Sequence, residues 1–325
     1  MGKLRVGVVG AGGISAMHLR SYRANAAQIV AVADVDLDRA QARAAEYGGK
    51  AYGDFHEMLE VERLDAVSIC TPPASHHEAA SAAISCGLPV LCEKPLARTA
   101  AEAREMVAAA DEAGTILMTG FCHRFHGPIV RLRQLLDEEA LGEPVAFRNR
   151  FATRIQSIQQ SWFVRPEVSG GGVLVDNGVH SVDLFRYLCG EVASTAARLR
   201  TVLPDLQVED TAALVVVAAS GLVGTIELSW ATPGSDNLVA VYGTEGQGVV
   251  DYNAGELRWR RAGEAEWQRE PAVPPDRFHL EIAHFLRCVE SGSRPRVDGR
   301  DGLRALEVIE DAYRSAGLGR ERSTG

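Results

Sequence analysis

The chain has 325 residues, 46% of them hydrophobic, and a formal net charge of −9 at pH 7. This length and composition suffice for two domains, each with its own core. The charge is spread along the chain without a basic block, which argues against nucleic acid and anionic membranes as main partners. The sequence enters a strand after three residues and has no apolar run as long as a membrane span. We therefore expect a cytoplasmic protein with small-molecule ligands.

The first predicted strand breaks into a glycine-rich turn. Residues 4–15 read LRVGVVGAGGIS, in which an apolar run precedes Gly10, Gly12 and Gly13. Glycines also end strands for structural reasons, but here they leave the N-terminus of the next helix open to a pyrophosphate. The third glycine of the strict dinucleotide motif is replaced by Ser15, a small residue whose hydroxyl can cap the helix. The predicted cofactor contacts in the turn are Gly10, Gly12, Gly13 and Ile14.

An acidic residue follows the second predicted strand. Residues 29–33 are apolar and end at Asp34, about 20 residues after the glycines, where dinucleotide folds bind the adenosine ribose. A carboxylate accepts hydrogen bonds from the ribose hydroxyls and repels a 2′-phosphate, so the sequence predicts NAD rather than NADP. Arg39 and Arg43 are near enough in the sequence to offset this repulsion.

The alternation of strands and helices continues to about residue 120. Further strands are predicted at residues 51–52, 66–70, 89–92 and 116–119, with helices beginning near residues 36, 54, 75 and 99. Strands separated by helices form parallel sheets with right-handed crossovers. We therefore predict an α/β fold whose residues 1–121 form a doubly wound, dinucleotide-binding domain.

Two strand ends are expected to line the cofactor crevice, because ligands of such sheets bind at the carboxyl ends of the strands. Lys94 follows a strand directly and is fixed by Pro95, which favours a functional role over a solvated one. His76, at a helix start, fits a functional role or a plain polar position equally well. The predicted cofactor contacts at these strand ends are Thr71, Pro72, His76, Glu93 and Lys94.

The pattern changes after Phe121. A helix is predicted over residues 128–139, followed by strands at residues 145–153, 212–218, 226–230, 239–241 and 257–259 and by helices at residues 278–290 and 303–315. The alternation of apolar and polar residues is typical of antiparallel strands. We predict a second, α+β domain over residues 122–325, with a large, mostly antiparallel sheet.

A glycine run opens a further helix within this second domain. Residues 170–183 read GGGVLVDNGVHSVD, so Asp176, His180 and Asp183 recur at helical spacing on one stripe. Ionisable groups on an apolar helix favour a stripe that faces a polar cavity, although a solvated outer face is the alternative.

The six cysteines do not form a metal-binding or redox pattern. They include no CxxC pair and no zinc-type spacing with histidine, so we predict small buried thiols and no metal.

Taken together, these motifs resemble the glucose-fructose oxidoreductase and inositol dehydrogenase family (Gfo/Idh/MocA). The resemblance rests on the dinucleotide turn, the Thr71-Pro72-x-x-x-His76 segment, Glu93-Lys94-Pro95, Gly120-Phe121 and the GGGxxxDxGxHxxD helix. It implies a Rossmann domain followed by a sheet domain, with NAD(P)-dependent oxidation or reduction of a sugar, cyclitol or related alcohol. It further implies a homodimer or homotetramer formed through the C-terminal sheet.

The resemblance assigns the catalytic roles to Lys94, Asp176 and His180. A histidine is suited to take the hydroxyl proton as the hydride leaves, and a lysine can donate a hydrogen bond to the same oxygen. Asp176 either orients His180 or binds a second substrate hydroxyl. Further substrate contacts are expected at Arg124, Trp162 and Asn177, which all lie in the predicted second domain. Two alternatives remain: an NAD-assisted redox cleavage of glycosides, and a dinucleotide-binding sensor without turnover.

Overall fold

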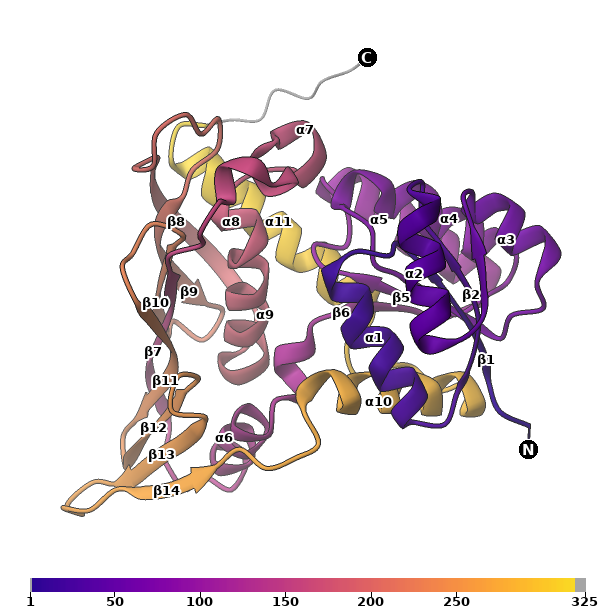
Figure 1. The fold of residues 1–325 in the computed structure, drawn as a ribbon. Coiled ribbons are helices and arrows are strands. Elements are labelled where there is room, and N and C mark those ends of the chain that lie inside the picture. The colour runs from indigo at the N-terminus through magenta and orange to yellow at the C-terminus, as the bar shows by residue number, and fades with distance from the viewer. Residues whose placement is uncertain (1, 319–325) are drawn as a thin grey trace. The chain divides into compact units, whose positions relative to one another are not determined.

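The computed structural model describes residues 2–318, which fall into two units (Figure 1). Within the described residues, the first unit joins 2–122 with Pro275–Leu303, and the second joins His123–Pro274 with 304–318. The division predicted from the sequence, 1–121 and 122–325, thus differs over Pro275–Leu303. The physical reason is helix α10 (Arg277–Ser291), which packs against helix α1 (Gly13–Ala24) of the first unit.

The first unit is built on a six-stranded parallel sheet with the order β3-β2-β1-β4-β5-β6. Its strands are β1 (Arg5–Val9), β2 (Gln28–Ala33), β3 (Lys50–Tyr52), β4 (Ala66–Ile69), β5 (Val90–Glu93) and β6 (Leu117–Gly120). All neighbouring pairs are parallel. This order, with crossovers in both directions from β1, confirms the predicted doubly wound fold.

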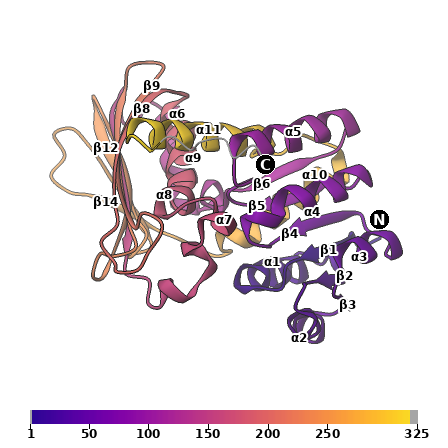
Figure 2. The same cartoon turned by 90° about the horizontal axis from the view of Figure 1, so that it is seen from above.

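Helices cover the first sheet on both faces, as Figure 2 shows. Besides α1 and α10 they are α2 (Leu37–Tyr47), α3 (Phe55–Val61), α4 (His76–Ser85) and α5 (Ala100–Ala113). Three of the predicted helix starts have side-chain caps, because Asp36, Asp54 and Thr99 accept backbone N–H bonds at the starts of α2, α3 and α5.

The second unit is built on an eight-stranded sheet with the order β14-β13-β12-β11-β7-β10-β9-β8. The strands are β7 (Pro144–Thr153), β8 (Val192–Arg200), β9 (Thr211–Ala218), β10 (Val223–Ser229), β11 (Ser235–Gly243), β12 (Gly246–Asp251), β13 (Glu256–Arg261) and β14 (Gln268–Pro271). Only the β7–β10 pair is parallel. The prediction of a mostly antiparallel sheet is confirmed, although β8, β12 and β14 had not been predicted.

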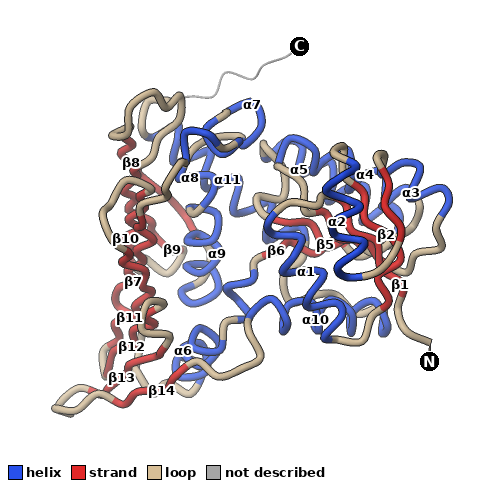
Figure 3. Tube along the Cα trace, in the orientation of Figure 1, coloured by secondary structure: helices blue, strands red, loops and turns tan. Residues whose placement is uncertain are grey.

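Helices α6 (Gly127–Asp137), α8 (Val173–Asp176) and α9 (Gly178–Cys189) pack on one face of the second sheet (Figure 3). Ile226, Leu228 and Trp230 alternate along the buried face and are at most 2% exposed. On strands β9 and β10 the outward positions are open, and Val215 and Val223 are 45% and 47% exposed. Helix α11 (Gly299–Ser315) ends the described chain. No helix within residues 2–318 is long and apolar enough to cross a membrane.

Candidate functional site

The glycine turn of the first unit has the geometry of an anion-binding loop. Gly10 has a φ of +98°, and a Cβ there would lie 2.6 Å from the backbone of Cys70, so that only glycine fits. At Gly12 and Gly13 an added Cβ would meet nothing within 4 Å. Helix α1 begins at Gly13 without an acidic residue in its first turn or a side-chain cap. The turn therefore fits a pyrophosphate bound at the helix N-terminus.

Ser15 does not cap this helix, contrary to the expectation. It lies inside the first turn, is fully buried, and its Oγ donates a 2.7 Å hydrogen bond to the Gly12 carbonyl. The hydroxyl instead holds the backbone of the turn, and the small serine side chain can be buried there.

Asp34 is fixed beside the glycine turn. Its carboxylate accepts hydrogen bonds from the N–H groups of Ala11 (2.7 Å) and Asp36 (2.9 Å). The Arg43 guanidinium donates to the carbonyls of Ala11 (3.4 Å) and Gly12 (3.2 Å), whereas Arg39 pairs with Asp36 at 2.9 Å. Of the two arginines that the sequence suggested, Arg43 is therefore the one held at the turn.

His76 braces the two strand ends that were predicted to line the crevice. Its ring is fully buried, with Nδ1 2.8 Å from the Pro95 carbonyl and Nε2 2.8 Å from the Thr71 carbonyl. Burial lowers the pKa of His76, although both carbonyls oppose that shift. Both ring nitrogens thus contact the protein's own backbone. Thr71 Oγ1, by contrast, is buried without a hydrogen-bond partner among the described residues, which suits a polar atom that contacts a ligand.

Glu93 is engaged inside the first unit. Its Oε1 lies 2.9 Å from Nε2 of His18, and its Oε2 accepts the N–H of Lys94 at 3.1 Å. The other ring nitrogen of His18, Nδ1, lies 3.2 Å from the Ser68 hydroxyl. This hydroxyl in turn lies 2.6 Å from the Tyr22 hydroxyl. These contacts make Glu93 a support for the backbone of Lys94, and a cofactor contact of Glu93 stays a prediction.

The pKa shifts of His18 and Glu93 favour the ionised form of this buried pair. Burial by itself lowers the pKa of His18, but the neighbouring Cys70 and Glu93 outweigh it and raise that pKa to about 10. Burial likewise raises the pKa of Glu93, but the bond to His18 and the charge of Lys94 hold it below its ordinary value.

In the second unit, Asp176 and His180 lie on two short helices rather than one. Asp176 ends α8, His180 lies in the first turn of α9, and Asn177 between them is the N-cap of α9. The expectation of one continuous helix was wrong at this break, although the spacing of the two side chains is kept. His180 is 7% exposed.

Glu209 positions the start of α8, and sequence reasoning had missed it. Its Oε1 accepts hydrogen bonds from the N–H groups of Gly172 (3.1 Å) and Leu174 (3.0 Å) and from the Tyr313 hydroxyl (2.7 Å). Burial raises the pKa of Glu209, and these bonds oppose the shift. A Cβ at Gly172 would lie 1.9 Å from the Glu209 carbonyl oxygen, which explains the glycine.

Arg124 and Asp183, which the sequence had singled out separately, form a buried ion pair. Arg124 Nε donates to Asp183 Oδ2 at 2.9 Å, and Nη2 donates to Oδ1 at 2.5 Å. The two residues are 7% and 1% exposed. The third member of the helix stripe therefore binds an arginine of the same unit. A substrate contact of Arg124 stays a prediction.

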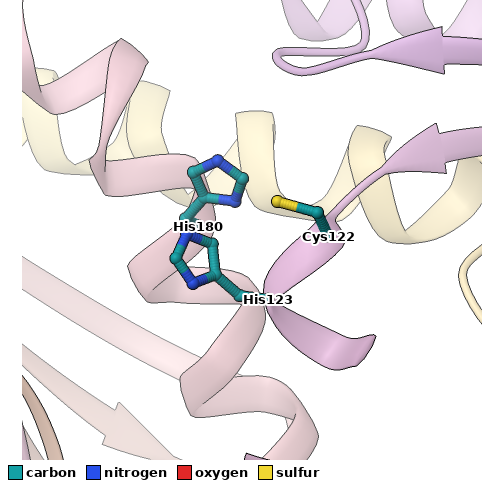
Figure 4. A group of neighbouring side chains, drawn as sticks. All are labelled: Cys122, His123 and His180. Carbon is teal, nitrogen blue, oxygen red and sulfur yellow. The ribbon is translucent and has the colours of Figure 1, made fainter. Parts of the chain in front are cut away.

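His123 is a second histidine beside His180, as Figure 4 shows. The ring centroids are 4.5 Å apart and edge-on, and His123 Nδ1 lies 2.8 Å from the Tyr252 hydroxyl. Ring nitrogens of both histidines and the Sγ of Cys122 lie within 4.8 Å of one another. Burial raises the pKa of the Cys122 thiol. That a metal takes no part stays a prediction.

Trp162 belongs to an aromatic group on the long loop after β7. Its ring stacks on Phe163 with centroids 4.0 Å apart, and Phe163 meets Trp230 edge-on at 6.2 Å.

A separate cavity of about 430 Å³ is lined by Arg154, Ile155, Gln156, Ser157, Gln159 and Leu203. Because neither Trp162 nor His180 lines this cavity, we do not assign it to the substrate.

Known proteins resemble the chain over nearly its whole length. Residues 4–121 match the model of the oxidoreductase family with an NAD-binding Rossmann fold, and residues 129–249 match the GFO/IDH/MocA C-terminal domain. The chain is 31% identical to the D-apiose dehydrogenase of Paraburkholderia graminis, over 96% of this chain and 88% of that protein. It is 30% identical to the myo-inositol 2-dehydrogenase of Thermotoga maritima, over 93% of each.

A solved structure shares the fold. A levoglucosan dehydrogenase, in complex with NADH and levoglucosan, superposes with a TM-score of 0.91 at 24% identity, covering 98% of each chain. The glycine turn and the anchored carboxylate of Asp34 lie within the residues that match the NAD-binding family model. The chain therefore belongs to the Gfo/Idh/MocA family of oxidoreductases, with an NAD-binding Rossmann fold.

Proposed function

We propose that the protein transfers a hydride between NAD and a secondary alcohol or ketone of a sugar, cyclitol or sugar derivative. The observation that carries the proposal is the buried His180, one helical turn after Asp176, in a chain whose first unit has an open glycine turn. The relatives support the substrate class, since they are named for activity on D-apiose and myo-inositol.

The first unit would hold the cofactor through the glycine turn, Asp34 and Thr71. Bound NAD supplies the hydride acceptor. The turn offers backbone N–H groups to the pyrophosphate, and Asp34 accepts hydrogen bonds from the ribose. Thr71 Oγ1 offers a polar contact that the described residues leave unsatisfied.

The catalytic roles follow from side-chain chemistry. Neutral His180 accepts the hydroxyl proton of the alcohol, and Lys94 donates a hydrogen bond to the oxygen as negative charge develops on it. Asp176 orients His180 or binds a second hydroxyl of the substrate. Trp162 and Asn177 are assigned to substrate recognition, together with the ion-paired Arg124.

We further propose that the protein acts as a homodimer or homotetramer in the cytoplasm. The support for assembly is the outward face of β9 and β10, where Val215 and Val223 are 45% and 47% exposed. The support for location is that all six cysteines are free thiols, which suits a reducing compartment.

The test is a near-ultraviolet nicotinamide assay over inositols, aldoses, ketoses and 1,5-anhydro sugars, with His180→Asn as the matched inactive control. We expect NADH formation with at least one of these compounds, at a rate about 10²–10⁴ lower in the control. Dinucleotide binding without turnover of any compound would favour the sensor alternative. Release of a sugar from a glycoside without net NADH would favour redox-assisted cleavage instead.

A further inference from the structure

His123 is a titratable group within contact distance of the proposed base, and no motif of the sequence had marked it. The two imidazole rings meet edge-on with centroids 4.5 Å apart (Figure 4). Two imidazolium ions this close repel each other, so the pair takes up its protons in two separate steps. Which ring takes the first proton decides whether His180 remains a base as the pH falls.

Tyr252 holds His123 in place. Its hydroxyl lies 2.8 Å from His123 Nδ1, and its own N–H donates to the Asn237 carbonyl at 3.0 Å. The ring of Tyr252 stacks on His126, with centroids 4.8 Å apart at 15°, and meets Phe151 edge-on at 5.5 Å. A tyrosine fixed on several sides presents its hydroxyl oxygen to a protonated His123 as an acceptor.

The surroundings favour His123 as the ring that takes the first proton. His180 is 7% exposed, whereas His123 is half-buried, so a charge on His123 loses less hydration. Cys122, Arg124, His126, Asp176 and Asp183 are ionisable groups close to the two rings in the sequence, and the proposed function adds the Lys94 ammonium, whose charge also disfavours a proton on His180. Of these, Arg124 and Asp183 form an ion pair with each other, and Asp176 lies four residues before His180.

We propose that His123, anchored by Tyr252, holds the proton that the two rings share and so keeps His180 neutral. This rests on the proposed function, in which the substrate hydroxyl gives its proton to neutral His180. His123 is thus a positioning residue that preserves the base toward lower pH.

The test compares the pH dependence of kcat/KM for alcohol oxidation in the wild type, His123→Phe and Tyr252→Phe. Phenylalanine at position 123 keeps an aromatic ring without a titratable group. We expect the acid limb of His123→Phe to move up by about one pH unit, with the neutral plateau within about threefold of the wild type. Tyr252→Phe should move the limb in the same direction by less. His56→Gln, which removes a half-exposed imidazole of the first unit, should leave the limb in place.

A second readout does not depend on catalysis. The imidazole signal of His180, assigned by its loss in His180→Asn, is titrated by NMR in the wild type and in His123→Phe. We expect His180 to take up its proton at a higher pH in the variant. His123→Gln serves as a second variant if the phenylalanine disturbs folding.

Three outcomes would overturn the proposal. One is an acid limb and a His180 titration that do not move in either His123 variant. Another is a shift to lower pH. The third is a loss of plateau activity in His123→Phe as large as that of His180→Asn, which would make His123 itself the proton acceptor. If His180→Asn retains full activity, His180 is not the base of the proposed function, and the NMR titration still decides the pairing.

Discussion

At the scale of single residues, the surroundings of His180 combine burial with a fixed neighbour. The ring is 7% exposed and meets His123 edge-on, so its orientation is set by packing as well as by the backbone of α9. A base that is fixed before the substrate arrives needs little reorganisation during proton transfer.

The first prediction concerns His180→Asn. Loss of the proton acceptor should lower kcat by about 10²–10⁴ and flatten the low-pH limb of the rate profile. Dissociation constants for NAD, measured by fluorescence titration, should stay within about twofold, because the glycine turn and Asp34 are untouched. Chelators such as EDTA should leave the wild-type rate unchanged. Full kcat with an unaltered profile in the variant would remove His180 from the mechanism.

The second prediction concerns Asp34→Ser. The carboxylate accepts N–H groups of the glycine turn, and we expect it to favour NAD by binding the ribose and repelling a 2′-phosphate. The ratio of kcat/KM for NAD to that for NADP should fall by about 10- to 100-fold in the variant. Asp38→Ser, which removes an exposed carboxylate from the first turn of α2, is the control and should leave the ratio unchanged. A wild type that prefers NADP would contradict the prediction, and Arg43 beside the turn would be its explanation.

At the scale of elements, the sequence predicted best where the signal is local. Glycines that end a strand, cap residues such as Asp36 and Thr99, and alternating apolar residues each act within one turn or one strand. The first sheet and most helices followed from such signals. Strands β12 and β14 could not be predicted from such signals. Two glycines lie at the start of β12, and β14 contains charged residues in place of alternating apolar ones. These strands are held by pairing with β13, a contact that no local pattern records.

The parts of the site that escaped prediction are contacts between distant residues. Glu209 binds the start of α8 from 37 and 35 residues away, and His18 meets Glu93 across 75 residues. His123 and Tyr252 are 129 residues apart. Each of these residues reads as an ordinary polar position until the fold brings the partners together.

The third prediction concerns the anchor of α8. Glu209→Ala removes one acceptor from three donors, so the free energy of unfolding in urea should fall by about 2–4 kcal/mol. Glu209→Gln keeps an oxygen in place and should lose less than about 1.5 kcal/mol. Tyr313→Phe deletes one of the three hydrogen bonds. Its free energy of unfolding should lie between those of the wild type and Glu209→Ala. Equal stability of Glu209→Ala and the wild type would show that the contacts do not hold the helix.

The fourth prediction concerns the pH dependence of the His18–Glu93 pair. The pKa of His18 is raised from 6.5 to about 10, so its stabilisation is complete below pH 6.5 and is lost as the pH rises toward 10. The pKa of Glu93 is lowered, so the stabilisation that its carboxylate contributes is lost only as the pH falls through that pKa. His18→Gln should therefore destabilise by about 3–5 kcal/mol at pH 6, and this difference should narrow toward pH 10.

A solvent-exposed ion pair provides the matched control for His18→Gln. Arg20 pairs with Asp276 at 2.9 Å, and both side chains are at least half exposed. Arg20→Gln should change the free energy of unfolding by less than about 1 kcal/mol. A difference between wild type and His18→Gln that does not vary with pH would contradict an ionised pair.

At the scale of the whole molecule, the fifth prediction concerns assembly. Val215→Lys places a charge on the outward face of β9, where we propose that a second copy packs, and should give a monomer of 34.9 kDa by light scattering. Val202→Lys alters a residue of similar exposure, 52%, outside the strands, and should leave the assembly intact. A wild type that is already monomeric at micromolar concentration would contradict the proposal.

The discontinuous first unit has a consequence for how the protein is made. Helix α10 binds α1 through Arg20–Asp276 and through Asn25, whose side chain donates to the His279 carbonyl at 3.2 Å. The ribosome must therefore synthesise His123–Pro274 before this partner of α1 exists. At about 5–20 residues per second this takes roughly 8–30 s, during which one face of α1 stays uncovered. A nascent chain stalled before residue 277 should accordingly be cleaved by protease within α1, and one from which α10 has fully emerged from the ribosome should resist.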